Sequence, residues 1–244
     1  QVWSSDDTDP IERLDIQSGL SYLYPQSTMG AHVSAAPHQQ TLRDTPLSTR
    51  FNVASFGDLG YELELKFMTH AELKELRGQI EFYKAHRKTL QFGRFYRFDE
   101  RKSNKVHWQV SSRDGKEHIV GHFQKLCTAS EGPDMLSVKG LEPTRRYRLC
   151  CKKQSIFIKR LGGLVKHVMP VELDPDGFIL RTANKYITMP DGAESFTATG
   201  AALMSGVGLN NQFLGTGYNE RLHMLGDFGS ALFTIEREDQ CEKA

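Results

Sequence analysis

Three carboxylates and a tryptophan stand within the seven positions from residue 3 to residue 9. Asp6, Asp7 and Asp9 follow Trp3 in the segment Trp-Ser-Ser-Asp-Asp-Thr-Asp. Neighbouring carboxyl groups suit acid–base chemistry, because one can donate a proton while another stays ionised. The spacing also fits a simpler interpretation, in which the three acids only favour the N-terminus of a helix. The residues by themselves leave both interpretations open.

Asp9 is expected to begin a helix. Its side chain suits the N-cap, Pro10 suits the first helical position, and Glu12 stands where a capping box places its acid. Asp6 and Asp7 would then lie on the loop before the helix, where α/β enzymes present acid–base groups. Glycoside cleavage needs two carboxyl groups on either side of the bond, and an aromatic ring such as Trp3 can pack on a sugar. Because one such cluster stands out, the second carboxylate would lie outside this chain.

The first 92 residues alternate between strand and helix patterns. After the Asp9 helix the expected elements are a strand at 29–34, a helix at 46–57, a strand at 60–65 and a long helix at 69–92. Thr69 and Glu72 form the capping box of that last helix. This alternation predicts a parallel α/β fold. A complete eight-stranded barrel needs about 250 residues. We therefore expect residues 1–92 to be the last βα units of a (β/α)8 TIM barrel.

From residue 93 the pattern changes to short runs of aromatic and β-branched residues. Asp114-Gly115 is a strong signal for a hairpin between two of these runs. Strands are expected at residues 95–98, 106–111, 118–126, 135–138, 147–150, 156–158, 178–180 and 231–236. This spacing is typical of an antiparallel sandwich. The predicted fold class is thus α/β plus all-β, with a C-terminal antiparallel β-sandwich domain at residues 93–244.

Composition argues against several classes of partner. The net charge of +1 over 244 residues does not favour nucleic acid or a membrane surface, and a basic run (Arg145, Arg146, Arg148, Lys152 and Lys153) fits a solvated strand. No apolar run approaches the roughly 20 residues of a membrane span. The four cysteines lack metal-type spacing and are expected to be thiols, which favours a cytoplasmic location. The chain opens on Gln1 without an initiator Met, so we expect a fragment whose true N-terminus is missing.

Other chemistry has weaker signals. His32, at the end of the strand at 29–34, and His38, in the loop beyond, could face an active-site mouth, although a structural role fits each as well. No His, Asp or Glu spacing indicates a metal, and no G-x-S-x-G elbow or nucleotide-binding glycine loop is present. We expect no metal and no cofactor.

Several segments closely resemble family 36 α-galactosidases (melibiases). Residues 3–17 match the family block W-x-S-D-x-T-D-x-x-x-R-L-x-I-Q, and residues 29–34 match M-G-A-H-V-S. The further matches are P-L-x-T-R at 46–50, F-G-x-L-G-Y-E-L at 56–63, the helix and domain entry at 80–84 and 90–97, and D-F-x-S at 227–230. The match is continuous through about residue 97 and patchy beyond.

The resemblance implies a retaining glycosidase that hydrolyses terminal α-1,6-galactosides such as melibiose and raffinose through a covalent intermediate. Asp6 would be the general acid/base, with Asp7 as the reserve candidate, and Trp3 would line the site. The family's nucleophile, in a K-W-D block, and its C-x-x-G-G-G loop are absent from these residues, so the fragment alone would be inactive. Relatives often form tetramers, which implies a homo-oligomer.

Two other functions compete with this one. A galactosyl-transferring enzyme of the raffinose-synthase kind belongs to the same family, but its usual block has Arg where Trp3 stands. A β-rich carbohydrate-binding or structural module without activity is the alternative from another class. Release of galactose from melibiose by the full-length protein would distinguish them.

Overall fold

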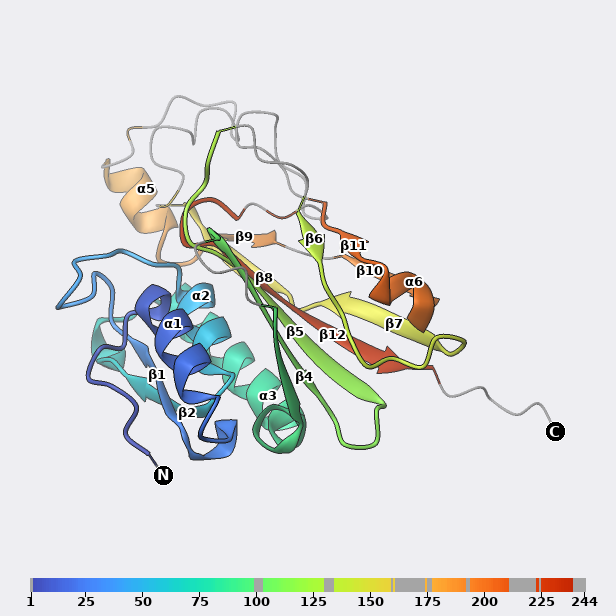
Figure 1. The fold of residues 1–244 in the computed structure, drawn as a ribbon. Helices are drawn as coiled ribbons and strands as arrows, with labels where there is room; N and C mark the ends of the chain where they lie inside the picture. The colour runs from blue at the N-terminus through green and yellow to red at the C-terminus, as the bar shows by residue number, and fades with distance from the viewer. Residues whose placement is uncertain are drawn as a thin grey trace.

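The computed structural model describes residues 2–98, 103–129, 134–158, 160, 174, 177–191, 194–210, 223 and 225–238. Within them, three helices lie between a small parallel sheet and a large antiparallel sheet (Figure 1). The parallel sheet and these three helices come from the chain up to Phe92, and the large sheet begins at Arg94. The structure therefore confirms a mixed helix and sheet fold with a β-rich C-terminal part.

The parallel sheet consists of two paired strands and one additional bridge. β1 (Gly30–Ser34) pairs in parallel with β2 (Asp58–Glu62). Val2 forms a parallel bridge with Met29, so a third segment runs beside β1 in the same direction. β2 lies earlier than the strand expected at 60–65, because Leu65–Phe67 forms a 3-10 turn (η2). Strands that alternate with helices in this way are confirmed; closure into a barrel stays a prediction.

Helix α1 (Pro10–Leu20) begins as expected, but its capping differs in one respect. Asp9 accepts hydrogen bonds from two amides of the first turn. The predicted capping-box role of Glu12 is wrong, because the Asp9 amide donates to Asp7 Oδ1 at 3.0 Å instead. The Glu12 carboxylate accepts a hydrogen bond from Arg43 Nη2 at 3.2 Å. Glu12 thus pairs with Arg43, which is distant in sequence, and it does not cap the helix.

Two further helices contribute residues to the same core. α2 (Leu47–Ala54) follows Pro46, and α3 (His70–Phe92) follows a short turn after β2. The capping box of α3 is confirmed: Thr69 Oγ1 accepts from the Glu72 amide at 3.2 Å, and Glu72 Oε2 accepts from the Thr69 amide at 2.8 Å.

The large sheet has six antiparallel strands in the order β10–β7–β12–β5–β4–β3. Its strands are β3 (Arg94–Phe98), β4 (Lys105–Ser111), β5 (Glu117–Gln124), β7 (Arg146–Cys151), β10 (Ser195–Thr199) and β12 (Ser230–Arg237). The hairpin predicted at Asp114-Gly115 is confirmed between β4 and β5. Gly115 has a φ of 68°, a left-handed conformation that favours glycine.

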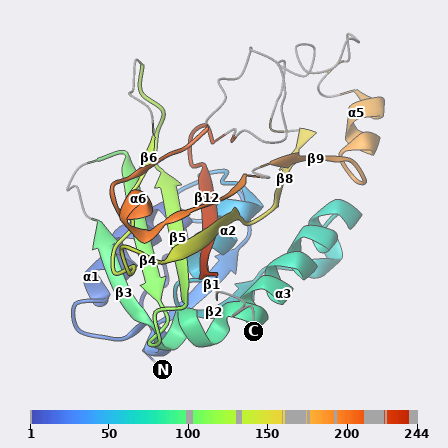
Figure 2. The same cartoon turned by 90° about the vertical axis from the view of Figure 1, so that its right-hand side faces the viewer.

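Smaller elements surround this sheet. β6 (Met135–Leu136) pairs with β11 (Val207–Gly208), β8 (Gln154–Phe157) pairs with β9 (Thr188–Asp191), and η1 (Gln26–Thr28), α5 (Phe178–Ala183) and α6 (Gly200–Met204) complete the described elements. The strand predicted at residues 178–180 is wrong, because these residues begin α5 at the periphery (Figure 2). Phe178 and Ile179 are exposed, so their apolar run does not mark a buried strand.

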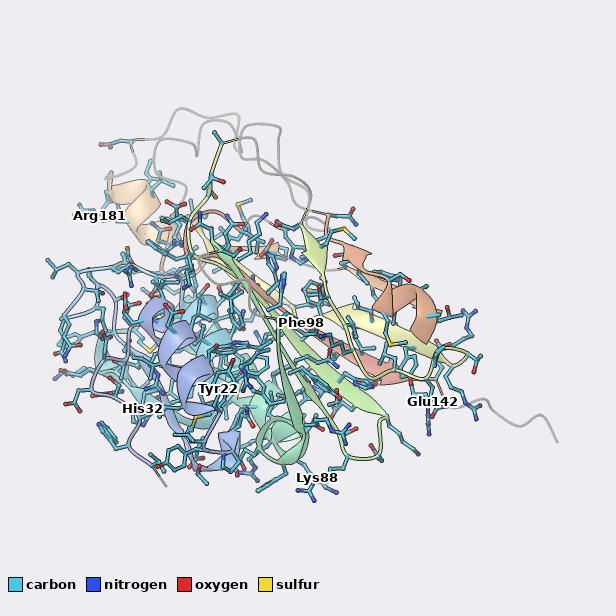
Figure 3. All side chains as sticks on the ribbon, in the orientation of Figure 1. Tyr22, His32, Lys88, Phe98, Glu142 and Arg181 are labelled. Atoms are coloured by element: carbon cyan, nitrogen blue, oxygen red, sulfur yellow. The ribbon has the colours of Figure 1, made fainter. Side chains whose placement is uncertain are left out.

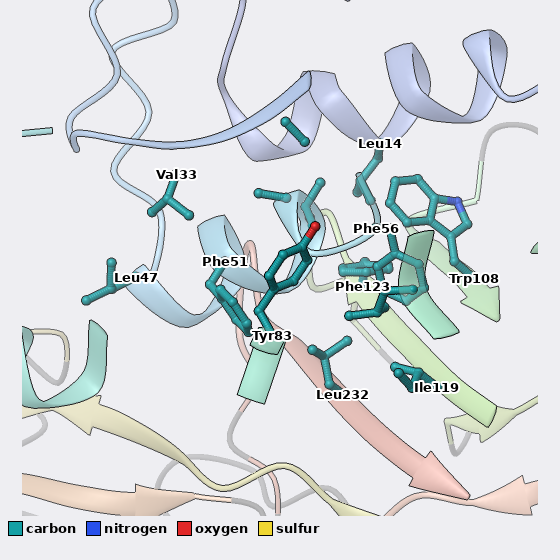
Figure 4. Packing of buried hydrophobic residues seen from close by; sticks show 14 of the residues in the cluster. Leu14, Val33, Leu47, Phe51, Phe56, Tyr83, Trp108, Ile119, Phe123 and Leu232 are labelled. Atoms are coloured by element: carbon teal, nitrogen blue, oxygen red, sulfur yellow. The ribbon is translucent and has the colours of Figure 1, made fainter. Parts of the chain in front are cut away.

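Both faces of the large sheet are covered. Trp108, Ile119, Phe123 and Leu232 pack on one face against residues of the helices (Figure 4). The other face packs against the β6–β11 pair and α6. In the β-rich part that the structure describes, the six-stranded sheet is thus covered on this face by the two-stranded β6–β11 pair and α6. The first cluster draws residues from both sides of position 92, and the two-domain division at that position stays a prediction.

Candidate active site

The acidic loop begins beside the first residues of β1 and reaches the carboxyl end of that strand at Ser34, whose Oγ donates a hydrogen bond to the Thr8 carbonyl at 3.2 Å. After Val2, Ser4 Oγ donates a hydrogen bond to the Gly30 carbonyl of β1 at 2.7 Å. Ala31 and Val33 are buried in the core beneath the helices. Because side chains alternate along a strand, His32 points to the opposite, helix-free face, where Figure 3 shows it. The loop and this face of β1 therefore meet at one edge of the sheet, as in the active sites of α/β barrels.

Trp3 and Asp6 form a direct pair at this edge. Trp3 Nε1 donates a hydrogen bond to Asp6 Oδ1 at 2.7 Å. Both side chains are exposed, and Trp3 is 64% accessible. The indole also lies against His32, with 5.4 Å between the ring centroids and the planes tilted by 58°. The structure thus brings together the predicted residues Trp3 and Asp6, and it places His32, the other candidate from the sequence, beside them.

His32 is held from the neighbouring strand. Its Nδ1 lies 3.4 Å from Glu62 Oε2, and its backbone pairs with Gly60 of β2. A Cβ atom at Gly60 would lie 2.6 Å from His32 Cδ2, so the glycine leaves room for the ring. Contacts therefore run without a break from Glu62 through His32 and Trp3 to Asp6. Sequence reasoning missed Glu62, because its place depends on the register of two strands.

Asp7 has a different environment from Asp6. Its side chain is 28% accessible, and Oδ1 accepts a hydrogen bond from the Asp9 amide at 3.0 Å. The Asp7 amide donates to Ser5 Oγ at 3.0 Å. His38 Nδ1 lies 4.0 Å from the same Asp7 oxygen. Asp7 therefore faces inward and fixes the turn, while Asp6 faces the surface.

Arg13 ties the acidic loop to β1. It is 3% accessible, and it donates to Ser4 Oγ at 2.5 Å and to the Gly30 carbonyl at 2.6 Å. Burial lowers the pKa of Arg13 to about 10, and the charge of Asp7 opposes that shift. An arginine with a pKa of about 10 remains protonated at neutral pH. Arg13 was not singled out from the sequence, although it stands in the matched family block.

His38 lies on the loop after β1 and is 3% accessible. Its Nε2 shares a hydrogen bond with Thr8 Oγ1 at 3.1 Å. Both residues line an open pocket of about 910 Å³, together with Arg50, Tyr61 and Phe67. His38 therefore lies next to the acidic loop, and its hydrogen bond to Thr8 is the kind of contact that a structural role requires.

The sequence also led to expectations about metal sites, membrane spans, cysteines and the basic run. In the described ranges, no group of three or more His, Cys, Asp and Glu residues could hold a metal ion. No described helix is long and apolar enough to cross a membrane. Cys127, Cys150 and Cys151 form no disulfide, and Cys241 lies outside the described residues. The basic run is not uniformly solvated, because Lys152 is 7% accessible and lies 3.9 Å from Glu75 of α3.

Two family models match most of the chain between them. The model described as Melibiase matches residues 1–93, and the model described as the glycosyl hydrolase family 36 C-terminal domain matches residues 105–235. The second match covers more than half of the 244 residues.

Curated relatives are also similar. The chain is 41% identical over 150 residues to α-galactosidase AgaA of Geobacillus stearothermophilus, with 61% of this chain and 21% of AgaA covered. It is 42% identical over 154 residues to α-galactosidase Mel36A of Lactobacillus acidophilus, with 61% of this chain and 20% of Mel36A covered. The chain thus spans about a fifth of the length of these relatives.

Solved structures of two α-galactosidases are similar to this chain. An AgaA variant bound to raffinose has a TM-score of 0.72 at 29% identity, with 98% of this chain and 26% of AgaA covered. The α-galactosidase of Lactobacillus brevis has a TM-score of 0.73 at 34% identity, with 100% of this chain and 27% of that protein covered. A similarity of this extent places the described elements in a known three-dimensional arrangement.

Proposed function

This chain belongs to glycosyl hydrolase family 36, and on that basis we propose that it supplies the general acid/base of a retaining α-galactosidase. The substrates are terminal α-1,6-galactosides such as melibiose and raffinose. The raffinose-bound structure of an AgaA variant supports this substrate class. Asp6 is the acid/base, and Trp3 lines the site beside it.

The observation that carries the assignment is the difference between the two neighbouring acids. Asp6 has an exposed carboxylate held by one donor, Trp3 Nε1. The Asp7 carboxylate accepts a hydrogen bond from the Asp9 amide next to the end of the helix. An acid/base must exchange a proton with substrate and water, so the accessible carboxylate suits that role. Asp7 remains the reserve candidate.

The reaction has two steps. In the first, a carboxylate from residues outside this chain bonds to the anomeric carbon, the glycosidic C–O bond breaks, and the Asp6 proton passes to the leaving oxygen. In the second, Asp6 takes a proton from water, the water oxygen bonds to the anomeric carbon, and the bond to the nucleophile breaks. Asp6 ends the cycle protonated again.

Residues 1–92 are the last βα units of a (β/α)8 barrel, and the parallel run of Val2, β1 and β2 supports this. The nucleophile comes from an earlier part of that barrel, so the chain by itself is inactive. The homo-tetramer that the family resemblance implies stays a prediction.

The test is Asp6→Ala in the intact protein that contains this chain and the rest of the barrel. We expect the variant to lose most of its activity on melibiose, whose leaving group needs protonation. Activated aryl galactosides need little acid assistance, so their first step should change less, and external azide should restore turnover by attacking the intermediate. Galactose release and product analysis measure this, and they also separate hydrolysis from transfer to another sugar.

Asp7→Asn is the matched comparison. It keeps an oxygen that can accept the Asp9 amide, so we expect no dependence on the leaving group and no azide rescue. Normal turnover of melibiose by Asp6→Ala, together with loss in Asp7→Asn, would transfer the acid/base role to Asp7.

A further inference from the structure

We propose that His32 and Glu62 are positioning residues that fix Trp3 against Asp6, and that Asp6 Oδ2 is the oxygen that transfers the proton. This inference rests on the proposed role of Asp6. It goes further in assigning a task to two residues on the neighbouring strands and in choosing between the two oxygens of one carboxyl group.

The choice of oxygen follows from the Trp3 hydrogen bond. An indole N–H can only donate, and it donates to Asp6 Oδ1 at 2.7 Å. In a protonated carboxyl group the carbonyl oxygen is the stronger acceptor, so a protonated Asp6 that keeps this bond carries its own proton on the other oxygen. Trp3 therefore leaves Oδ2 to face the substrate oxygen, and it stays in place while Asp6 alternates between acid and base.

Trp3 needs support to hold this orientation. It is exposed on a loop, and an exposed tryptophan has several rotamers available. The His32 ring packs against the indole with 5.4 Å between the centroids. This contact limits the indole to orientations in which Nε1 can reach Asp6.

His32 is in turn fixed by β2. Its Nδ1 lies 3.4 Å from Glu62 Oε2, and Gly60 gives room for the ring. The Glu62 side chain is 58% accessible, and exposed pairs contribute little energy. The contact therefore orients the ring rather than stabilising the fold, so its loss should be visible in catalysis more than in stability.

The experiment measures kcat/KM for melibiose and for an aryl galactoside in the intact protein. Trp3→Phe keeps a ring and removes the N–H, and we expect a loss of about 10- to 100-fold on melibiose, the range for a hydrogen bond to a charged group. The aryl substrate should lose much less. His32→Gln, Glu62→Gln and Gly60→Ala should shift the ratio of the two substrates in the same direction by a smaller factor.

Controls separate positioning from general damage. Glu64→Gln changes an exposed acid two residues from Glu62, and its partner is Lys66 at 2.6 Å, so the substrate ratio should not change. His32→Gln added to Trp3→Phe should have no further effect, because both act through the same hydrogen bond. His32→Phe keeps a ring next to Trp3 and serves if His32→Gln fails to fold.

Three results would overturn the inference: equal losses on both substrates, fully additive effects in the double variant, or a ratio unchanged by Trp3→Phe. If Asp6→Ala discriminates between the substrates and the His32 variants do not, this inference fails and the proposed function stands. If Asp6→Ala does not discriminate, the proposed function fails first.

Discussion

Three neighbouring aspartates have different roles because each has different partners. Asp6 contacts the indole of Trp3 at the surface. Asp7 accepts the amide of Asp9 inside the turn. Asp9 is fully buried, and it bonds to Thr41 and Arg43 as well as to the first turn of α1. At the scale of single residues, accessibility and hydrogen-bond partners distinguish acids that are equivalent in the sequence.

Asp9 leads to a prediction about pH. Burial alone would raise the pKa of Asp9, but hydrogen bonds from Thr41, Ile11 and Arg43 and the Arg43 charge hold it below its ordinary 3.8. A lowered folded-state pKa gives stability that is present above the unfolded value and is lost as the pH falls through the folded one. Asp9→Asn should therefore destabilise the protein by about 1.5–3 kcal/mol at pH 7, the range for a hydrogen bond to a charged group. The difference from the parent should shrink below about pH 4.

Denaturant unfolding at pH 7 and pH 3 measures this difference. Asp15→Asn is the control, since Asp15 is exposed and bonds to Lys125 at the surface. A loss of stability in Asp9→Asn that is equally large at both pH values would contradict the electrostatic explanation.

Part of the site could be predicted from the sequence. Trp3, Asp6 and Asp7 stand together in one segment, so spacing and family resemblance were enough to select them. Glu62 joins His32 through the pairing of β1 with β2, and Arg13 acts through burial beneath the loop. Both depend on contacts between segments that a linear pattern does not record.

At the scale of elements, the cap of α3 should have a measurable effect. Thr69 and Glu72 satisfy two amides that the helix itself leaves without acceptors. Thr69→Ala should destabilise the protein by about 1 kcal/mol, the usual cost of losing an N-cap. In a Glu72→Ala background, Thr69→Ala should cost less than in the parent, because the bond from Thr69 Oγ1 to Glu72 Oε2 at 2.9 Å is already lost and only the bond from the residue-72 amide remains.

A double-mutant cycle in thermal or denaturant unfolding gives the coupling between Thr69 and Glu72. Thr28→Ala provides a comparison, because the exposed Thr28 hydroxyl donates to the Pro25 carbonyl near a short 3-10 turn. If the coupling is zero, the two residues do not act as one cap.

The elements differ in how far local sequence determines them. α1 and α3 were predictable because their first residues cap them, and the β4–β5 hairpin because its turn requires glycine. The run Phe178-Ile179-Leu180 was mistaken for a strand because a short apolar run fits a strand and a helix equally well. Leu180 is buried while its two neighbours are exposed, which is a helical pattern that only the fold makes visible.

At the scale of the whole molecule, one face of the large sheet buries a polar cluster. His107 Nε2 and His122 Nδ1 are 2.5 Å apart on paired strands β4 and β5. Asp134 Oδ2 lies 3.9 Å from His122 Nε2, and Lys105 contacts the same carboxylate. Burial lowers the pKa of His107 to about 4, and burial with the charges of His107, Lys105 and His223 lowers that of His122.

These histidines should make stability depend on pH. The unfolded chain binds protons below the ordinary value of 6.5, whereas folded His107 stays neutral until about pH 4. Stability should therefore fall as the pH drops from 6.5 to 4, by up to about 1.4 kcal/mol per pH unit for each histidine. His107→Gln keeps a donor for His122 and removes one titration, so relative to the parent it should become more stable as the pH drops.

Urea unfolding at pH 7, 6, 5 and 4.5 checks this dependence. His70→Gln, at an exposed position on α3, should follow the parent curve. Parallel curves for the parent and His107→Gln would show that folded His107 is not kept neutral.

The large sheet is also bonded to the helices through polar contacts. Thr49 Oγ1 donates to the Phe228 carbonyl at 2.7 Å, and Asn52 Nδ2 donates to Ser230 Oγ at 2.9 Å. These bonds connect α2 with the beginning of β12. No local pattern predicts this connection, since the partners are about 180 positions apart.

The central position of β12 has a consequence for the folding of the chain during synthesis. β12 follows the other five strands of the sheet in sequence, yet it lies between β7 and β5. In the described sheet only β12 joins β10–β7 to β5–β4–β3, so a chain without residues 230–237 would leave two ribbons, each with an unpaired edge. Such edges readily pair with other chains. We therefore expect a stop codon before residue 230 to give a product that associates through these edges rather than one that forms a shortened sheet.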